Sequence, residues 1–210
     1  GTKPDIDNKV KIINGNVTNN EDWKTVFSDF SPEVVIHLAA ETGTGTSGYA
    51  NLCFRPGSQI LLGGGRIVIE WAFKLPSLSG GYDTYTVYMG LVDSSAGSAP
   101  VDGVYLQYTD SVNSGQWQIK TSSNSTATTT STATAADTSW HRATLDINAA
   151  ASSVEFFLDG TSLGTHTTNI PNATGRETVA GFLIAKSAGT TTRYIYMDYF
   201  SLYQKLTTSR

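Results

Sequence analysis

Hydrophobic residues alternate with other residues along most of the chain after about residue 48, and this period of two most limits the possible fold. In one segment, one side carries Ile67, Ile69, Trp71 and Phe73, and the other carries Arg66, Val68, Glu70 and Ala72. Successive side chains of a β-strand point to opposite faces, so residues 66–73 are predicted to form a strand with one buried face. Further short segments rich in β-branched and aromatic residues are 85–92, 103–108, 116–121, 142–147, 153–158, 179–186 and 193–203. Strands at this spacing, separated by turn residues, predict a mainly β fold, an antiparallel β-sandwich of the jelly-roll type.

One turn within this region is specified by two residues. Asp159-Gly160 lies between the hydrophobic residues 156–158 and the segment 162–164. Both central positions of a tight primed turn have positive φ, which Asp and Gly accept more readily than other residues. We therefore predict a β-hairpin centred on Asp159 and Gly160.

A run rich in hydroxyl side chains lies between residues 121 and 139, where 13 of 19 residues are Ser or Thr. A flexible linker is one interpretation, because small polar side chains bury little apolar area. We favour a solvated strand pair, since Thr forms strands well and the run contains neither Pro nor Gly. Such strands could lie on an outer face or line a subunit contact, and the second arrangement would suit a homotrimer.

The first 46 residues follow a different pattern. Residues 10–13 are predicted to form a strand, residues 19–30 a capped helix and residues 32–38 a buried strand, which together make a βαβ-like appendage. We therefore expect a division at residue 46, with the β-sandwich in residues 47–210.

Charge and hydrophobicity exclude several classes of partner. The chain carries 18 acidic and 14 basic residues, with a net charge of −4, so neither nucleic acid nor an anionic membrane is expected to bind it. No segment approaches the roughly 20 apolar residues of a membrane span. The single cysteine, Cys53, cannot form a disulfide within the chain.

Residues 10–47, VKIINGNVTNNEDWKTVFSDFSPEVVIHLAAETGTGTS, resemble part of the extended short-chain dehydrogenase/reductase family, which includes nucleotide-sugar epimerases. Taken alone, this resemblance implies an NAD-binding sugar-nucleotide enzyme. However, dinucleotide binding needs a glycine-rich turn from a strand into a helix, and Gly63–Gly65 lead into a strand instead. The family's catalytic Tyr-x-x-x-Lys pattern is also missing. We therefore interpret the segment as a detached fragment and predict no cofactor.

A second resemblance covers residues 48–208. The segments SWHRATLDINAAASSVEFFLDGTSLGTHTTNIP and TTRYIYMDYFSLYQ are similar to strands of concanavalin A-like and laminin G-like jelly rolls. With NSGQWQIKTSSN, they are also similar to domains of bacteriophage tail fibres and tailspikes. This resemblance implies a non-catalytic role in recognition or assembly at a virion tail or another extracellular surface, with a cell-surface carbohydrate as the ligand.

A sugar-binding surface needs exposed aromatic rings beside amide or charged side chains. We therefore predict ligand contacts from the middle strands and loops, at Tyr82, Tyr108, Trp117 and Gln118. Other large aromatic residues are expected in the hydrophobic core, namely Trp71, Trp140, Phe156 and Tyr199.

Loop carboxylates and amides would suit a structural calcium ion, for which the candidates are Asp93, Asp102, Asp110 and Asn113. The histidines do not follow a metal-binding pattern, because none of them has carboxylates at ligand spacing in the sequence.

The main alternative is a polysaccharide-cleaving enzyme, a glycosidase or a lyase. A glycosidase requires two carboxylates about 5 to 9.5 Å apart. Glu155 and Asp159 are the best pair in the sequence, whereas Glu70 and Asp198 each stand alone. Since Asp159 belongs to a predicted turn, we assign no catalytic residue. A fragment of an NAD-dependent sugar-nucleotide enzyme is the second alternative.

Overall fold

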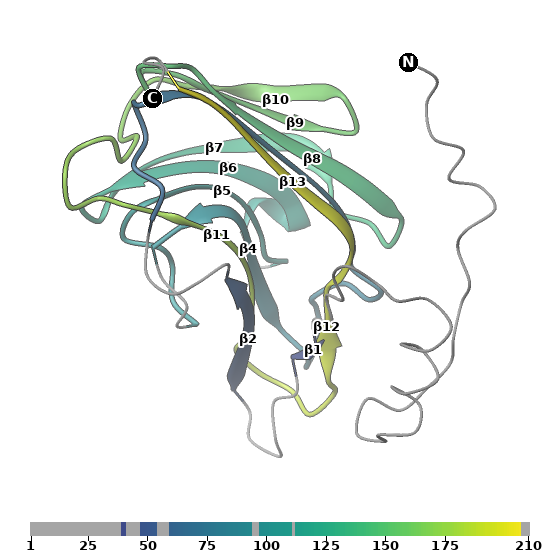
Figure 1. Cartoon of the computed structure of the whole chain (residues 1–210). Helices are drawn as coiled ribbons and strands as arrows, with labels where there is room; N and C mark the ends of the chain where they lie inside the picture. The colour runs from purple at the N-terminus through teal and green to yellow at the C-terminus, as the bar shows by residue number, and fades with distance from the viewer. Residues whose placement is uncertain (1–38, 41–46, 54–58, 94–96, 111, 207–210) are drawn as a thin grey trace, which may run out of the picture. The chain divides into compact units, whose positions relative to one another are not determined.

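The computed structural model describes residues 39–40, 47–53, 59–93, 97–110 and 112–206 (Figure 1). These residues belong to one compact unit, His37–Arg210. The predicted βαβ-like appendage lies outside the described residues, apart from the short strand β1 (Ala39–Ala40). This strand pairs antiparallel with β12 (Arg193–Tyr194).

The described residues form a β-sandwich of two antiparallel sheets, as predicted. One sheet has six strands in the order β2 (Gly48–Cys53), β11 (Val179–Lys186), β4 (Tyr85–Val92), β5 (Gly103–Tyr108), β6 (Gln116–Ser123) and β7 (Thr126–Ala135). The other has five strands in the order β10 (Thr161–His166), β9 (Val154–Leu158), β8 (Trp140–Ile147), β3 (Gly65–Lys74) and β13 (Tyr196–Leu206). No α-helix occurs among the described residues, only the 3₁₀ turn η1 (Asn113–Gly115).

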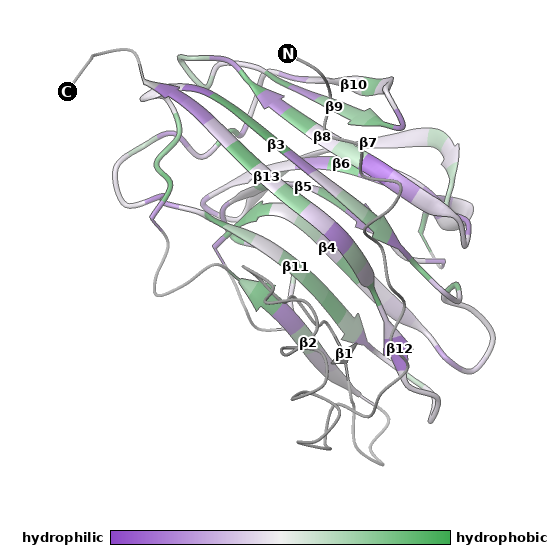
Figure 2. Cartoon of the chain, turned by 45° about the vertical axis from the view of Figure 1, so that its right-hand side comes forward, coloured by the Kyte–Doolittle hydropathy of each residue, from purple (hydrophilic) through white to green (hydrophobic). Residues whose placement is uncertain are grey.

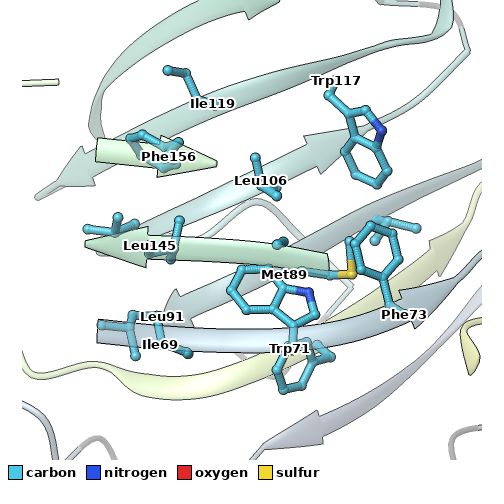
Figure 3. Packing of buried hydrophobic residues seen from close by; sticks show 14 of the residues in the cluster. Ile69, Trp71, Phe73, Met89, Leu91, Leu106, Trp117, Ile119, Leu145 and Phe156 are labelled. Atoms are coloured by element: carbon cyan, nitrogen blue, oxygen red, sulfur yellow. The ribbon is translucent and has the colours of Figure 1, made fainter. Parts of the chain in front are cut away.

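The hydrophobic core lies between the two sheets because each strand contributes one face to it. In β3, every second residue from Ile67 to Phe73 is fully buried, as the alternation predicts. Trp71 packs edge-on against Phe182 of the opposite sheet, with ring centroids 5.6 Å apart. Phe73 packs in the same way against Trp117 at 5.5 Å. These aromatic pairs join the sheets, and Figure 3 shows Trp71, Phe73 and Trp117 in the packed core.

Hydrophobic and hydrophilic residues alternate along β3, β8 and β13, as the hydropathy colours of these strands show (Figure 2). Trp71 and Phe156 are buried as predicted, but the predictions for Trp140 and Tyr199 are wrong. Trp140 is 51% exposed because its neighbour His141 takes the inward position at the start of β8. Tyr199 is 37% exposed and lies where the register between β13 and β3 shifts.

The predicted hairpin forms between β9 and β10. Asp159 and Gly160 both have positive φ, 52° and 79°. The Asp159 carboxylate accepts a hydrogen bond from the backbone N–H of Arg142, at 2.7 Å. The turn therefore closes the hairpin and also anchors it to β8.

The Ser/Thr-rich run forms a strand pair as predicted, since β6 and β7 are neighbours and β7 lies at the edge of the six-stranded sheet. Its inward hydroxyls make specific contacts. Thr121 and Thr130 lie on the two sides of the His166 ring, 3.0 and 2.9 Å from Nδ1 and Nε2. Hydrogen bonds thus replace hydrophobic packing at this end of the sandwich.

Candidate functional site

The six-stranded sheet carries a polar row on its outer face, the face turned away from the core. Strand register places one residue of each strand side by side, in the order Asn51, Leu183, Tyr88, Gln107, Gln118 and Ser131. We call this set the amide row. Neighbouring strands lie about 4.8 Å apart, so adjacent side chains of the row are within reach of one ligand.

A second row lies two residues further along each strand. It consists of Cys53, Gly181, Gly90, Tyr105, Lys120 and Thr129, and we call it the lysine row. A Cβ atom added to Gly181 would lie 2.4 Å from a methyl carbon of Val92, so only a hydrogen atom fits there. The glycine lets neighbouring outward side chains pack closely.

Two glutamines of the amide row are buried although they face away from the core. Gln107 is 8% exposed and Gln118 is 5% exposed. The Nε2 of Gln118 donates a hydrogen bond to the hydroxyl of Ser131, at 3.2 Å. The Oε1 atoms of Gln107 and Gln118 have no hydrogen-bond partner. Unpaired buried acceptors destabilise a fold, so the two glutamines are candidates for contact with a donor from outside the chain.

Two buried tyrosines lie beside the glutamines, with Tyr88 8% and Tyr105 2% exposed. Tyr88 and Tyr105 meet edge to face, with centroids 5.8 Å apart, and form a small cluster with Val92 and Leu183. Burial raises the pKa of both phenols, and the nearby Tyr88 and Asp93 raise that of Tyr105 further. Both tyrosines are therefore neutral hydrogen-bonding groups at neutral pH.

Lys120 is half-buried next to Tyr105. Burial lowers the pKa of its ammonium group, and no carboxylate of a described residue raises it. On the other side of Lys120, Thr129 and Ser131 of the edge strand β7 are exposed. The amide and lysine rows are therefore most accessible from the β7 side.

The structure separates the four predicted ligand contacts. Gln118 lies in the amide row, whereas Tyr82 is 94% exposed in the loop before β4. Tyr108 and Trp117 are 1% and 0% exposed and belong to the hydrophobic core between the sheets rather than to the outer face. The hydroxyl of Tyr108 accepts a hydrogen bond from the backbone N–H of Ser79, at 3.0 Å. Tyr88, Gln107 and Lys120 of the two rows are absent from the sequence-based prediction.

The residues predicted for calcium lie in two pairs at opposite ends of β5. Asp102 forms an ion pair with Arg176 at 3.0 Å, and Asp93 accepts a hydrogen bond from the backbone N–H of Val101. At the other end, Asp110 accepts from the hydroxyl of Ser79. The Asn113 amide donates to the backbone oxygens of Trp117 and Thr132. These four residues therefore do not form one site. Among the described residues, no three or more His, Cys, Asp or Glu side chains come together in a way that could hold a metal ion.

The carboxylates considered for catalysis belong to the five-stranded sheet and its hairpin turn. Glu70 accepts hydrogen bonds from Tyr199 and Thr144 and lies 3.7 Å from Arg142. Burial and Glu70 together raise the pKa of Tyr199 to about 12, despite the opposing effect of Arg142. Glu155 accepts from the Ser162 hydroxyl at 2.9 Å. Glu70 and Glu155 therefore already serve local contacts.

Asp159 instead takes part in a histidine cluster that the sequence spacing did not indicate. His141 is 9% exposed, and its Nδ1 lies 2.7 Å from Asp159 while its Nε2 lies 3.1 Å from Asp137. Asp137 also accepts from the backbone N–H of Ser139. Because the second carboxylate comes from the hairpin turn, the arrangement became visible only in the fold. It joins the β9–β10 hairpin to the start of β8.

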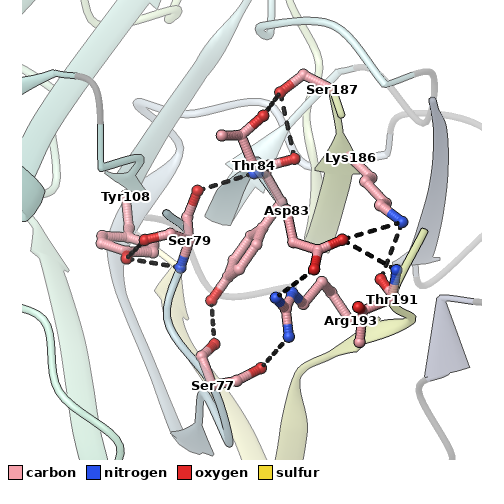
Figure 4. Close-up of polar contacts among 10 residues, drawn as sticks. Ser77, Ser79, Asp83, Thr84, Tyr108, Lys186, Ser187, Thr191 and Arg193 are labelled. Carbon is pink, nitrogen blue, oxygen red and sulfur yellow. Dashed lines mark hydrogen bonds and ion pairs between the residues drawn. The ribbon is translucent and has the colours of Figure 1, made fainter. Parts of the chain in front are cut away.

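A further polar cluster joins the loops that precede β4 and follow β11 (Figure 4). Asp83 lies 3.2 Å from Arg193 and 3.9 Å from Lys186, and it accepts a hydrogen bond from the backbone N–H of Thr191. The Thr191 contact is the main cause that lowers the pKa of Asp83, and the two cations lower it further. Arg193 also donates to the Ser77 hydroxyl at 3.0 Å. We interpret this cluster as a structural link.

The β-sandwich is similar to solved structures of carbohydrate-active and carbohydrate-binding proteins. The endo-1,3-β-glucanase of Streptomyces sioyaensis is 16% identical, with a TM-score of 0.51, over 73% of this chain and 69% of the glucanase. The carbohydrate recognition domain of Emp46p in its potassium-bound form is 11% identical, with a TM-score of 0.52, over 76% of this chain and 80% of that domain. At these identities the likeness establishes the jelly-roll fold.

The chain belongs to the family described as SO2946-like, C-terminal domain, whose sequence profile matches residues 35–198. The match covers nearly all of the described β-sandwich. No helix in the described part of the chain is long and apolar enough to cross a membrane.

A separate, short likeness concerns a sugar-nucleotide enzyme. The dTDP-L-rhamnose 4-epimerase of Burkholderia thailandensis is 51% identical over 39 residues. This stretch is 19% of the chain and 11% of the epimerase, so the chain spans only a small part of that relative. The likeness is to the enzyme class that residues 10–47 resemble.

Proposed function

We propose that the β-sandwich recognises carbohydrate without cleaving it, and that the glycan binds across the amide and lysine rows. The observation that carries this proposal is the pair of unpaired, buried Oε1 atoms of Gln107 and Gln118. Both atoms are buried, so the two glutamine side chains must turn towards solvent before sugar hydroxyls can donate to them. Ser131 and Thr129 offer further hydroxyls on the accessible side.

Tyr88 and Tyr105 lie beside the amides but are 8% and 2% exposed, so they form the apolar base of this face and do not offer a ring on which a sugar stacks. The similarity to a carbohydrate recognition domain and to a glucanase is consistent with this proposal, although it concerns the fold.

Binding fits this face better than hydrolysis because the whole sheet lacks acids. None of the six strands contains Asp or Glu. Glycosidases use two carboxylates that flank the scissile bond. A polysaccharide-cleaving enzyme would therefore need acids from loops or from another face, and it remains the alternative hypothesis.

Glycan binding can be tested with an array and with three variants of matched chemistry. Gln107→Met and Gln118→Met remove one amide each, while Gln204→Met changes an exposed glutamine on the other sheet. Loss of one hydrogen bond, worth about 1 kcal/mol, should weaken binding roughly five- to tenfold in the first two variants. Gln204→Met should bind like the parent protein.

Two results would reject the proposal. One is an array without any bound glycan, and the other is unchanged affinity in both Gln107→Met and Gln118→Met. Release of reducing ends from a bound polysaccharide would instead favour the enzyme.

We further propose that this recognition takes place at a virion tail or another extracellular surface, as the resemblance to tail-fibre domains suggests. A homotrimer is part of this proposal, with its contacts away from Thr129 and Ser131 of the edge strand β7, which the glycan needs. Light scattering of the full chain tests the trimer, because a monomeric mass would exclude it.

A further inference from the structure

The strands of the six-stranded sheet carry few charges, and all of them are positive. These strands contain two charged residues, Lys120 and Lys186, and no acid. Lys186 is only 5% exposed and lies 3.9 Å from its counter-ion, Asp83. Lys120 is therefore the one charge that these strands present on the outer face.

Among the described residues, Lys120 has no counter-ion at ion-pair distance. No ion pair joins it to another described residue, whereas Arg66, Arg142 and Arg176 on the same sandwich each lie close to an acid. Asp93, the acid that acts on Tyr105, follows the end of β4 and is two strands away from Lys120. Neighbouring strands are about 4.8 Å apart, so this separation exceeds the length of a direct ion pair.

The environment of Lys120 favours a partner of opposite charge. Burial lowers the pKa of its ammonium group because the charged form loses solvation. A bound anion would offset that loss and would form charge-assisted hydrogen bonds with the ammonium group. The Oε1 acceptor of Gln118 and the hydroxyl of Thr129 lie beside Lys120, where they can bind the uncharged part of a sugar.

We propose that Lys120 binds the carboxylate of an acidic sugar, so that the preferred ligand is a glycan containing uronic acid rather than a neutral one. This inference rests on the proposed function and names the ligand class of the same site. The carboxylate lies against Lys120 in the lysine row. Hydroxyl groups of the same glycan donate to the glutamine acceptors of the amide row.

The test compares acidic polysaccharides with their own carboxyl-reduced forms, in which each carboxylate has become a hydroxymethyl group. Polygalacturonate, alginate and hyaluronate serve as probes, together with a sulfated neutral polymer. The full chain is assayed with Lys120→Gln, with Lys120→Arg, and with Lys74→Gln as a control on β3 of the other sheet. The parent should bind at least one acidic polymer about tenfold more tightly than its reduced form.

Lys120→Gln should abolish this preference, whereas Lys120→Arg and Lys74→Gln should retain it. Circular dichroism checks that the variants keep the fold. Equal binding of acidic and reduced polymers, or an unchanged preference in Lys120→Gln, would overturn the inference.

The other outcomes separate this inference from the proposed function. Stronger binding of the sulfated polymer than of any carboxylate polymer also overturns the choice of uronic acid. Binding of neutral glycans alone overturns the inference and leaves the proposed function standing, while no binding to any polymer overturns both.

Discussion

Replacing Gln107 by methionine should make the protein more stable, although it removes a polar side chain from a buried site. The Oε1 of Gln107 has no hydrogen-bond partner, and the residue is only 8% exposed. A buried acceptor left unpaired costs roughly 1–3 kcal/mol, and methionine is a flexible apolar residue of similar length. We therefore expect the free energy of unfolding to rise by about 1 kcal/mol or more.

Urea denaturation and calorimetry would measure this change. For a chain of this length, about 1 kcal/mol corresponds to a shift in Tm of roughly 2–4 °C. Gln204→Met is the control, because Gln204 is exposed and its replacement should change stability by less than about 0.5 kcal/mol. A Gln107→Met variant that is less stable by about 1 kcal/mol would refute the reasoning, since the amide would then support folding.

Three further predictions concern the core, the hairpin and the end of the sandwich. Trp71→Ala should lower the free energy of unfolding by roughly 3–5 kcal/mol in urea titrations, because Trp71 is fully buried between the sheets. Gly160→Ala should cost about 1 kcal/mol in the same assay, because its φ is 79° and no atom lies within 4 Å to clash. Asp83→Asn should lower Tm at neutral pH by leaving Lys186 and Arg193 without their carboxylate. Since the pKa of Asp83 is lowered from 3.8 in the fold, its contribution is present above that pH and disappears as pH falls further, so parent and variant should converge below about pH 3.8.

Much of the fold is predictable from the sequence because period two is strong in most strands. The predicted limits of residues 85–92, 103–108 and 179–186 agree with β4, β5 and β11. The final strand differs, since residues 193–203 divide into β12 and a β13 that extends to Leu206. A register shift cannot be read from side-chain alternation alone, and it also explains the exposed position of Tyr199.

The candidate site is predictable only in part. Alternation in β6 places Trp117 and Ile119 inward, and this same pattern indicates that Gln118 and Lys120 point outward. The same alternation in β5 places Tyr108 inward and Tyr105 outward. It would therefore have replaced Tyr108 by Tyr105 in the list of predicted outward residues. The rows themselves depend on which residues of six strands lie side by side, and the register that decides this comes from the packed sheet.

The edge strand β7 has a consequence for how readily recognition can change. Its outward residues Thr129 and Ser131 are exposed beside the candidate site, and the hydrophobic core does not depend on them. Substitutions at such surface positions usually change stability by less than about 0.5 kcal/mol. Under the proposed function, natural variation or a randomised library at these positions would change ligand preference while the same sandwich continues to fold.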